Sequence, residues 1–196
     1  MANPNKPMGL VPVQYMDGSP WNGGTRTYFI PSTDTNAYAI GDPVVSNGSG
    51  DANGVPGVIL ATAGFGNSVR GVIVGFGTRE GLMADPANLD SMIIPATKTK
   101  NYYVMVADDP NILFEIQESA GTLLTTDIGS NADLLAGTNS GYASGWTLNS
   151  ASANVGATRQ LKLVGLARKA DNTFGLYAKW LVRINNHELS GGTTGV

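Results

Sequence analysis

The sequence predicts an all-β protein, either an antiparallel β-barrel or a jelly-roll-like sandwich, with long loops. Composition is the first reason: 26 of 196 residues are glycine and only 14% are charged, whereas long helices favour Ala, Glu, Lys and Leu. Alternation is the second: in Ala178–Leu189, the apolar residues Trp180, Val182 and Ile184 alternate with polar ones, which is the period of a half-buried strand. Spacing is the third, since about nine short apolar segments are separated by turn residues.

The predicted strands are short and lie between runs of Gly, Pro, Asn and Asp. In chain order they are Arg26–Ile30, Tyr38–Val45 with a turn at Gly41–Pro43, Val58–Ala61, Val69–Val74, Tyr102–Glu118, Gln160–Ala167 and Ala178–Leu189. Alternation slips near Gly165, which predicts a β-bulge there. Asn47–Gly54 is predicted to be a long exposed loop. We expect a short helical turn near Asn131–Leu135, and a helical turn or an excursion within Ala84–Pro95.

Tyr102–Glu118 is predicted to form a β-hairpin. Alternating apolar residues, among them Val104 and Val106, stand on both sides of Asp108–Asn111. Pro110 suits the second position of a type I turn. The neighbouring carboxylates of Asp108 and Asp109 are expected to be solvated in this turn, so they do not predict acid–base chemistry.

Residues 1–25 are rich in Pro, Gly and Asn, yet they carry apolar anchors. These anchors are Leu10, Val11, Val13, Tyr15 and Trp21. Two interpretations remain open: an extended arm that lies along its own domain or a neighbour, and a plain first strand. The expected organisation is therefore the N-terminal segment 1–25, a single β-rich domain at 26–189, and a flexible tail at 190–196.

The net charge of −3 provides no overall basic field that would attract nucleic acid. Charge is nevertheless divided along the chain: Asn101–Thr158 holds six acids and no base, whereas Arg159–Arg183 holds six bases and one acid. Pairing across neighbouring strands of one sheet would explain this division. Complementary faces on neighbouring subunits are the less favoured alternative.

The sequence contains no cysteine, so disulfides, thiolate catalysis and cysteine-bound zinc are excluded. The N-terminal segment lacks the apolar stretch of a signal peptide, and no window approaches 18 uninterrupted apolar residues. We therefore expect a cytosolic product without a membrane partner.

No catalytic constellation stands out. The single histidine, His187, is expected at the surface or in a capping position, and no G-x-S-x-G sequence supplies a nucleophile. The glycines of Gly75–Gly81 do not match the dinucleotide-binding spacing. The loop Asn47–Gly54 resembles the first half of a calcium loop, but the position of its last ligand falls on Leu60. We expect no enzyme activity, no cofactor and no metal.

Aromatic residues could form a sugar-stacking platform, but core packing is their more usual place at strand spacing. The aromatics in question are Tyr102, Tyr103, Phe114, Trp146, Tyr177 and Trp180. Trp21 and Trp146 lie in predicted loops. Because exposed tryptophans favour contact sites, both are candidate contact residues.

Several segments together resemble the head-decoration or cement proteins of tailed bacteriophages, which bind the outside of the capsid shell. The segments that carry this resemblance are Gly9–Gly23, Tyr38–Gly50, Ala107–Gly137 and Ala178–Leu189. They span nearly the whole chain, and their motifs are structural patterns instead of active-site signatures.

The resemblance implies a β-barrel or sandwich body on the capsid surface of a virion, made in the host bacterial cytoplasm. Its partners would be the major capsid protein and further copies of itself, with a trimer favoured over a dimer. In this interpretation the N-terminal arm grips a capsid or sister subunit. The candidate contact residues are Leu10, Val11, Val13, Tyr15, Trp21 and Trp146. The alternative function is a carbohydrate-binding or host-adhesion β-sandwich module of the virion, with a glycan as its ligand.

Overall fold

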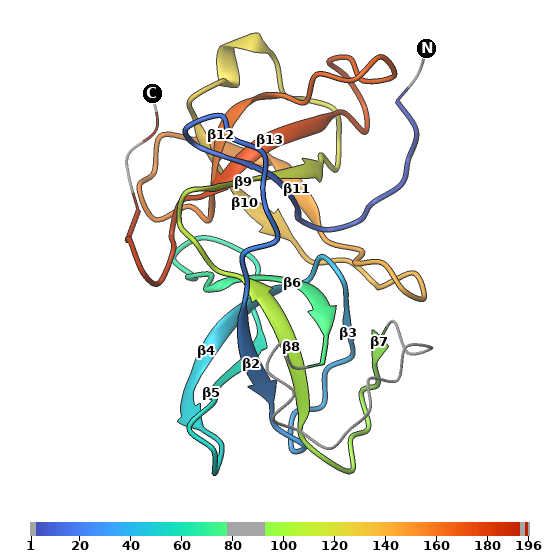
Figure 1. Ribbon diagram of the computed structural model, residues 1–196. Coiled ribbons are helices and arrows are strands. Elements are labelled where there is room, and N and C mark those ends of the chain that lie inside the picture. Colours follow the sequence, from blue (N-terminus) through green and yellow to red (C-terminus); the bar gives the residue numbers. More distant parts are fainter. Residues whose placement is uncertain (1–2, 78–92, 193–194, 196) are drawn as a thin grey trace.

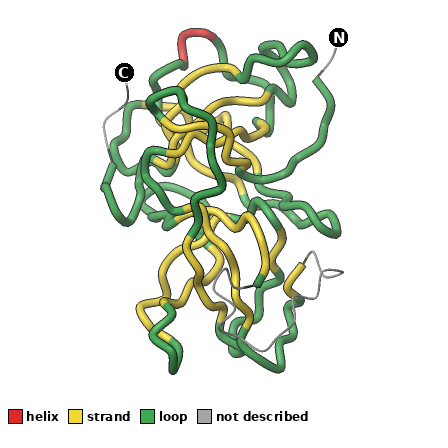
Figure 2. Tube along the Cα trace, in the orientation of Figure 1, coloured by secondary structure: helices red, strands yellow, loops and turns green. Residues whose placement is uncertain are grey.

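The computed structural model describes residues 3–77, 93–192 and 195, and it confirms the all-β prediction: 44% of residues lie in strands and 2% in helix. Two β-bodies stand one above the other in Figure 1, a six-stranded sheet at the top and a closed barrel at the bottom. Figure 2 shows that loops connect nearly all of these strands and that, among the residues described, helix is confined to one short turn.

The barrel closes in the strand order β2-β5-β4-β6-β8. Its strands are β2 (Arg26–Ile30), β4 (Pro43–Gly50), β5 (Pro56–Leu60), β6 (Gly71–Phe76) and β8 (Tyr102–Ala107). The pairing of β2 with β5 is parallel, and the other pairings are antiparallel. Buried side chains from these strands, including Tyr28, Ile73 and Val104, fill the barrel interior.

A small ladder extends the barrel body. It consists of β3 (Tyr38–Ala39) and β7 (Ile93–Ile94), which pair in antiparallel fashion. Tyr38 and Ile94 are fully buried and belong to the same core as the barrel interior. Most of Ala84–Pro95, where a helical turn or an excursion was predicted, lies outside the described residues.

The upper body is an antiparallel sheet in the order β1-β9-β13-β12-β10-β11. Its strands are β1 (Val11–Tyr15), β9 (Ile112–Gln117), β10 (Asn131–Leu135), β11 (Thr147–Asn154), β12 (Leu161–Leu166) and β13 (Lys179–Ile184). Leu148 at the start of β11 forms a bridge with Glu118 just after β9, so the sheet curls around its own core. Trp180, Val182 and Ile184 lie in that core, which confirms the predicted alternation of β13.

The two bodies are interleaved in the chain. The N-terminal strand β1 belongs to the upper sheet, the next strands build the barrel, and from β9 onward every strand belongs to the sheet again. Residues 3–25 lie against the upper body of the same chain, because β1 pairs with β9. Lys6 N–H donates to Gln117 Oε1 at 2.8 Å, and Asn3 exchanges hydrogen bonds with Thr173 at 2.8 and 2.9 Å.

The predicted hairpin at Tyr102–Glu118 is wrong in its pairing. The turn itself forms, because Ile112 N–H donates to Asp109 O at 3.1 Å with Pro110 at the second position. However, β8 pairs with β2 and β6 in the barrel, whereas β9 pairs with β1 and β13 in the sheet. The chain uses this turn to pass from one body to the other, and alternation alone does not encode which partner a strand will choose.

Two further local predictions have opposite outcomes. The bulge near Gly165 is confirmed, because the register of β12 against β13 shifts between Leu163 and Gly165. The helical turn predicted near Asn131–Leu135 is wrong: those residues form β10, and the short 3-10 helix lies earlier, at Thr125–Asp127. The Asp127 carboxylate fixes that turn by accepting the Leu124 N–H at 2.7 Å.

Candidate functional site

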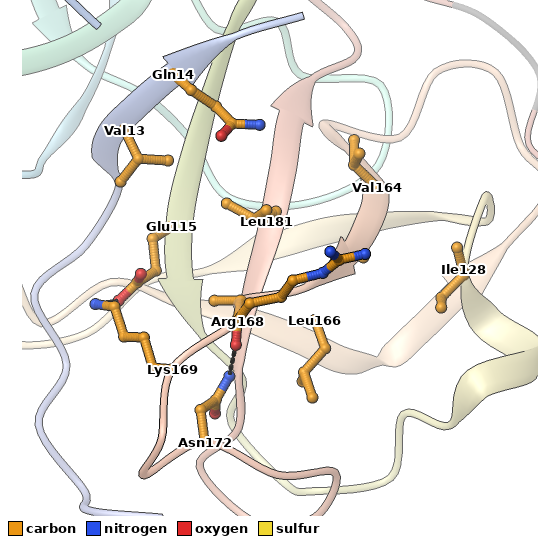
Figure 3. Close-up of a pocket in the computed structure, with 12 residues that line it drawn as sticks. Val13, Gln14, Glu115, Ile128, Val164, Leu166, Arg168, Lys169, Asn172 and Leu181 are labelled. Carbon is orange, nitrogen blue, oxygen red and sulfur yellow. Dashed lines mark hydrogen bonds and ion pairs between the residues drawn. The ribbon is translucent and has the colours of Figure 1, made fainter. Parts of the chain in front are cut away.

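A groove on the outer face of the upper sheet is the candidate functional site (Figure 3). It has a volume of about 870 Å³ and is lined from β1, β9, β13 and β12, from the loop after β12 and by Ile128, which follows the short 3-10 helix. Its lining residues are Val13, Gln14, Glu115, Ile128, Val164, Gly165, Leu166, Ala167, Arg168, Lys169, Asn172 and Leu181. Because these strands are neighbours in one sheet, strand pairing sets the positions of most of these side chains.

The floor of the groove follows from strand alternation. On β13, Trp180 and Val182 point into the core, so Leu181 between them points to the opposite face. Leu181 is in register with Glu115 of β9 and with Gly165 of β12. A Cβ at Gly165 would meet no described heavy atom within 4 Å, so the glycine at the bulge leaves the floor open beside Leu181.

The loop after β12 forms a wall of the groove and is held by the side chain of Asn172, which is 8% exposed. Its Nδ2 donates to the backbone oxygens of Ala167 and Lys179, both at 2.8 Å, and its Oδ1 accepts the Lys179 N–H at 2.8 Å. The amide therefore ties the loop to the start of β13. Such a wall is formed before any ligand arrives, so binding costs little ordering of the groove.

Apolar side chains gather on this outer face. Val164 is 37% exposed and Ile128 is 42% exposed, and Leu181, Leu166 and Val13 are half-buried around them. A single exposed apolar residue is normal on a protein surface, but a group of them in one concave area is typical of a contact site.

The charges around the groove are predominantly positive. Lys169 Nζ lies 2.7 Å from Glu115 Oε1, and Lys179 Nζ lies 4.0 Å from the same oxygen. Arg168 is exposed, and its side chain extends from the loop over the strands (Figure 3). Within the described part of the chain, the Arg168 side chain makes no ion pair or hydrogen bond, so it faces the groove with an uncompensated charge.

Two of the predicted contact residues lie inside the protein. Leu10 is 1% exposed and Trp146 is 3% exposed, and both belong to the core of the upper sheet. The expectation that Trp146 is exposed is wrong. Gly137 and Gly145 lie so close together that a side chain on either would collide with the other's backbone region, and this close approach brings Trp146 inward.

The other predicted contact residues lie at the surface of the same sheet. Val11, Val13 and Tyr15 are half-buried on β1, and Trp21 is half-buried against the sheet's core. Among the six, Val13 lines the groove. One signal in the sequence could have indicated the groove. Leu181 is an apolar residue at an outward position of a strand that otherwise alternates.

A buried polar network joins the two bodies, and the sequence did not indicate it. Asp108 is 5% exposed, so the expectation that it is solvated is wrong. Its Oδ2 accepts the Tyr28 hydroxyl at 2.6 Å and lies 3.6 Å from Arg70 Nε and 3.4 Å from Arg26 Nη1. Arg70 also reaches Glu188, at 3.9 Å, which follows the last strand of the upper sheet. Burial raises the pKa of Tyr28 to about 12, and the Asp108 carboxylate adds to this effect.

His187 lies beside this network and is 1% exposed, so of its two predicted positions the surface one is wrong and the capping one agrees with its hydrogen bond to the next turn. Its Nδ1 accepts the Leu189 N–H at 3.0 Å, which fixes the chain turn after β13. Burial lowers the pKa of His187, because a buried site disfavours the charged imidazolium. The nearby Ser46 hydroxyl donates to Glu188 Oε2 at 2.6 Å. The Ser46–Glu188 hydrogen bond thus holds the segment after β13 against β4.

The loop that resembles half of a calcium site uses its carboxylate for other purposes. Asp51 Oδ1 accepts the N–H groups of Asn53 and Val55 at 2.9 and 2.8 Å, and Oδ2 accepts the Tyr103 hydroxyl at 2.6 Å. Strand β4 also runs to Gly50, so the predicted loop is shorter than expected. Among residues 3–77, 93–192 and 195, no group of three or more His, Asp or Glu side chains is placed to hold a metal ion.

The division of charge along the sequence is partly neutralised within one chain. Arg159 pairs with Asp133 through a close contact, and Lys169 pairs with Glu115. Both pairs join the basic segment to the acidic segment within one chain, but Arg159 lies before β12 and Lys169 in the loop after it, so these are loop-to-strand pairs and not pairs across neighbouring strands.

No protein-family model, no curated protein and no solved structure matches this chain. In the part of the chain that the structure describes, there is no helix long and apolar enough to cross a membrane.

Proposed function

We propose that this chain is a structural protein of a bacteriophage virion. It binds the outer surface of the capsid shell and adds contacts between major capsid subunits, as decoration or cement proteins do. The observation that carries the proposal is the groove: a preformed, partly apolar concave surface on a rigid sheet, with several positive side chains around it. The resemblance of the sequence to decoration proteins supplies the identity of the partner.

The proposed mechanism requires no catalytic group. Each apolar contact removed from water contributes roughly 25 cal/mol per Å², and the contribution is repeated at every equivalent site of a closed shell. A protein that binds the assembled shell but not its separated subunits stabilises the assembled state by linkage. The same reasoning holds for a homo-oligomer, with a trimer favoured over a dimer, because several grooves would then engage neighbouring capsid subunits at once.

The proposal places the shell contact on the outer face of the sheet and not on a reaching arm. Residues 3–25 are held along their own chain, and Leu10 is buried in its own core. Val11, Tyr15 and Trp21 are half-buried and border the same body, so they remain candidates for the rim of a contact.

Carbohydrate binding is the alternative, and it would need an aromatic platform. Trp146 is buried, so of the two tryptophans on which this alternative was based only Trp21, which is half-buried, could contribute a ring. Phe65 and Tyr142 are 65% and 64% exposed, but they come from separate loops. Quenching of tryptophan fluorescence by oligosaccharides would favour this alternative.

The test is co-sedimentation of the purified protein with undecorated shells of the phage that encodes it. We expect saturable binding with a fixed number of copies per capsid subunit, and a higher melting temperature of the decorated shell. Failure to bind at micromolar protein would overturn the proposal, because specific interfaces of ordinary size bind more tightly than that.

A further inference from the structure

We propose that the groove binds an extended acidic segment of the partner protein, one that presents a carboxylate beside branched apolar side chains. This inference rests on the proposed function, in which the partner is the major capsid protein. It adds the position of the contact on this chain and the chemistry of the segment that fills it.

The floor of the groove is apolar and partly exposed. Val164 and Ile128 are exposed, and Leu181 is half-buried between β12 and β9. At the bulge, Gly165 contributes no side chain, so the floor is hollow beside Leu181. Branched aliphatic side chains that enter the open space beside Leu181 would remove the apolar atoms of the floor from water.

The charged side chains at the groove are mostly positive. Two cations, Arg168 and Lys169, and one carboxylate, Glu115, line the groove, which leaves a net charge of +1 (two minus one), and Lys179 Nζ lies 4.0 Å from the same carboxylate. This local charge is opposite in sign to the net charge of −3 of the whole chain. Both lysines lie near the Glu115 carboxylate, and Arg168 is the cation that remains available. A guanidinium favours two parallel hydrogen bonds to a carboxylate, so the complementary ligand is acidic.

The mode of binding follows from the edge of the sheet. The outer side of β1 is already paired, because Trp21 N–H donates to Val13 O at 3.1 Å and Tyr15 N–H donates to Ser19 O at 2.8 Å. A partner segment therefore does not extend the sheet by strand addition over these residues. It lies on the face, and its side chains make the contact.

The experiment compares charge reversal inside and outside the groove. The groove variants are Arg168→Glu and Val164→Asp, and the matched controls are Lys100→Glu at the far end of the barrel body and Val155→Asp on an exposed position after β11. The probe is again the undecorated shell, titrated by co-sedimentation. We expect each groove variant to weaken shell binding at least about tenfold, and each control to stay within about twofold of the unaltered protein.

The outcomes separate this inference from the proposed function. If the unaltered protein binds shells and both groove variants bind equally well, the groove inference is overturned while the proposed function stands. If the unaltered protein does not bind shells, the proposed function fails, and the groove inference fails with it. Should Val164→Asp disturb folding, Arg168→Glu decides, because the Arg168 side chain is exposed and supports no described contact.

A second copy of this chain is the competing occupant. Sedimentation velocity of the unaltered protein and of Arg168→Glu measures it directly. An oligomer that dissociates in the variant would overturn the choice of partner, because the groove would then hold a sister subunit. An unchanged oligomer together with lost shell binding supports the inference.

Discussion

The barrel and the upper sheet are built from similar strands, but only the upper sheet has edge strands. The barrel closes on itself, so each of its five strands has a neighbour on both sides. The upper sheet has end strands, β1 and β11, and an outer face that carries the groove. The closed body pairs its strands with one another, whereas the open body presents a face for contact.

The two bodies also differ in how the chain supplies their strands. The barrel strands come from one continuous stretch, residues 26–107, whereas the sheet combines β1 with strands that begin at residue 112. Pairing of β1 with β9 thus closes a loop that contains the entire barrel. Such a long-range contact costs more loop-closure entropy than the contacts within residues 26–107, so we expect the sheet to depend on the barrel more than the barrel depends on the sheet.

The largest effect is expected from deleting residues 2–20. An intact upper sheet in this variant would contradict the difference drawn between the two bodies. The deletion removes β1, leaves one side of β9 unpaired and removes Leu10 from the core. We expect a loss of at least about 5 kcal/mol in the free energy of unfolding of the upper sheet, since burial of one leucine alone accounts for about 2–5 kcal/mol. Hydrogen exchange should show lost protection in β9 and β13 and retained protection in β6 and β8.

Met16→Ser is the control for this deletion. Met16 lies on the same segment and is 49% exposed, so its side chain adds little to the core. The variant should unfold like the unaltered protein. Equal protection of β9 and β13 in the deletion variant and in Met16→Ser would show that the N-terminal strand is dispensable, and it would restore the reaching-arm interpretation.

An intermediate effect is expected from Glu118→Gln, which tests the core at the place where the sheet curls back. Glu118 is 0% exposed, and burial raises its pKa to about 7, although the Leu123 amide and the Trp180 indole act in the opposite direction. The folded protein then holds the proton more tightly than the unfolded chain, whose glutamate has a pKa near 4.5. Stability therefore falls as pH rises from about 4.5 to about 7, and it stays level above that range.

Glutamine removes this charge, so the variant should keep its stability across that range. We expect Glu118→Gln to be more stable than the unaltered protein by up to about 3 kcal/mol at pH 8, with no difference at pH 4. Urea unfolding at a series of pH values measures it, with the exposed Asp171→Asn as the control. Parallel stability curves for Glu118→Gln and the unaltered protein would exclude a buried ionised glutamate.

The strands could be predicted from the sequence because their signal is local. Alternation in Ala178–Leu189 and the slip at Gly165 each depend on a few neighbouring residues, and both are confirmed. Pairing is not local. The segment at Tyr102–Glu118 reads as a hairpin, yet its two strands serve different cores on either side of a well-formed turn.

The site was harder to predict than the fold for the same reason. Nothing in the letters around Asp108 shows that Tyr28 and Arg70 arrive from other strands to bury it. Trp146 stands among loop residues, and its burial depends on the close approach of two glycines. Leu181 was the local signal for the groove, but its meaning depends on the bulge at Gly165 in the neighbouring strand.

The smallest effect is expected from Tyr28→Phe. This variant tests whether the Asp108 network couples the barrel to the upper sheet. The Tyr28 hydroxyl donates to Asp108 Oδ2 at 2.6 Å and accepts from Arg70 Nε at 2.9 Å. Phenylalanine fills the same space but removes both hydrogen bonds. Asp108 keeps its two arginines, so we expect a loss of about 1–3 kcal/mol, the usual range for a hydrogen bond to a charged group. Urea unfolding at pH 7 measures this loss.

Tyr103→Phe is the matched control, because its hydroxyl also donates to a carboxylate at 2.6 Å, but to Asp51 in a turn within the barrel body. Two probes, tryptophan fluorescence for the upper sheet and hydrogen exchange of β6 for the barrel, should coincide in the unaltered protein and in Tyr103→Phe. We expect them to separate in Tyr28→Phe, since the junction then no longer couples the bodies fully. If both variants lose the same stability and their probes still coincide, the Asp108 network adds no coupling, and apolar packing, in which Val72 and Ala107 of the barrel join the core of the upper sheet, holds the two bodies together.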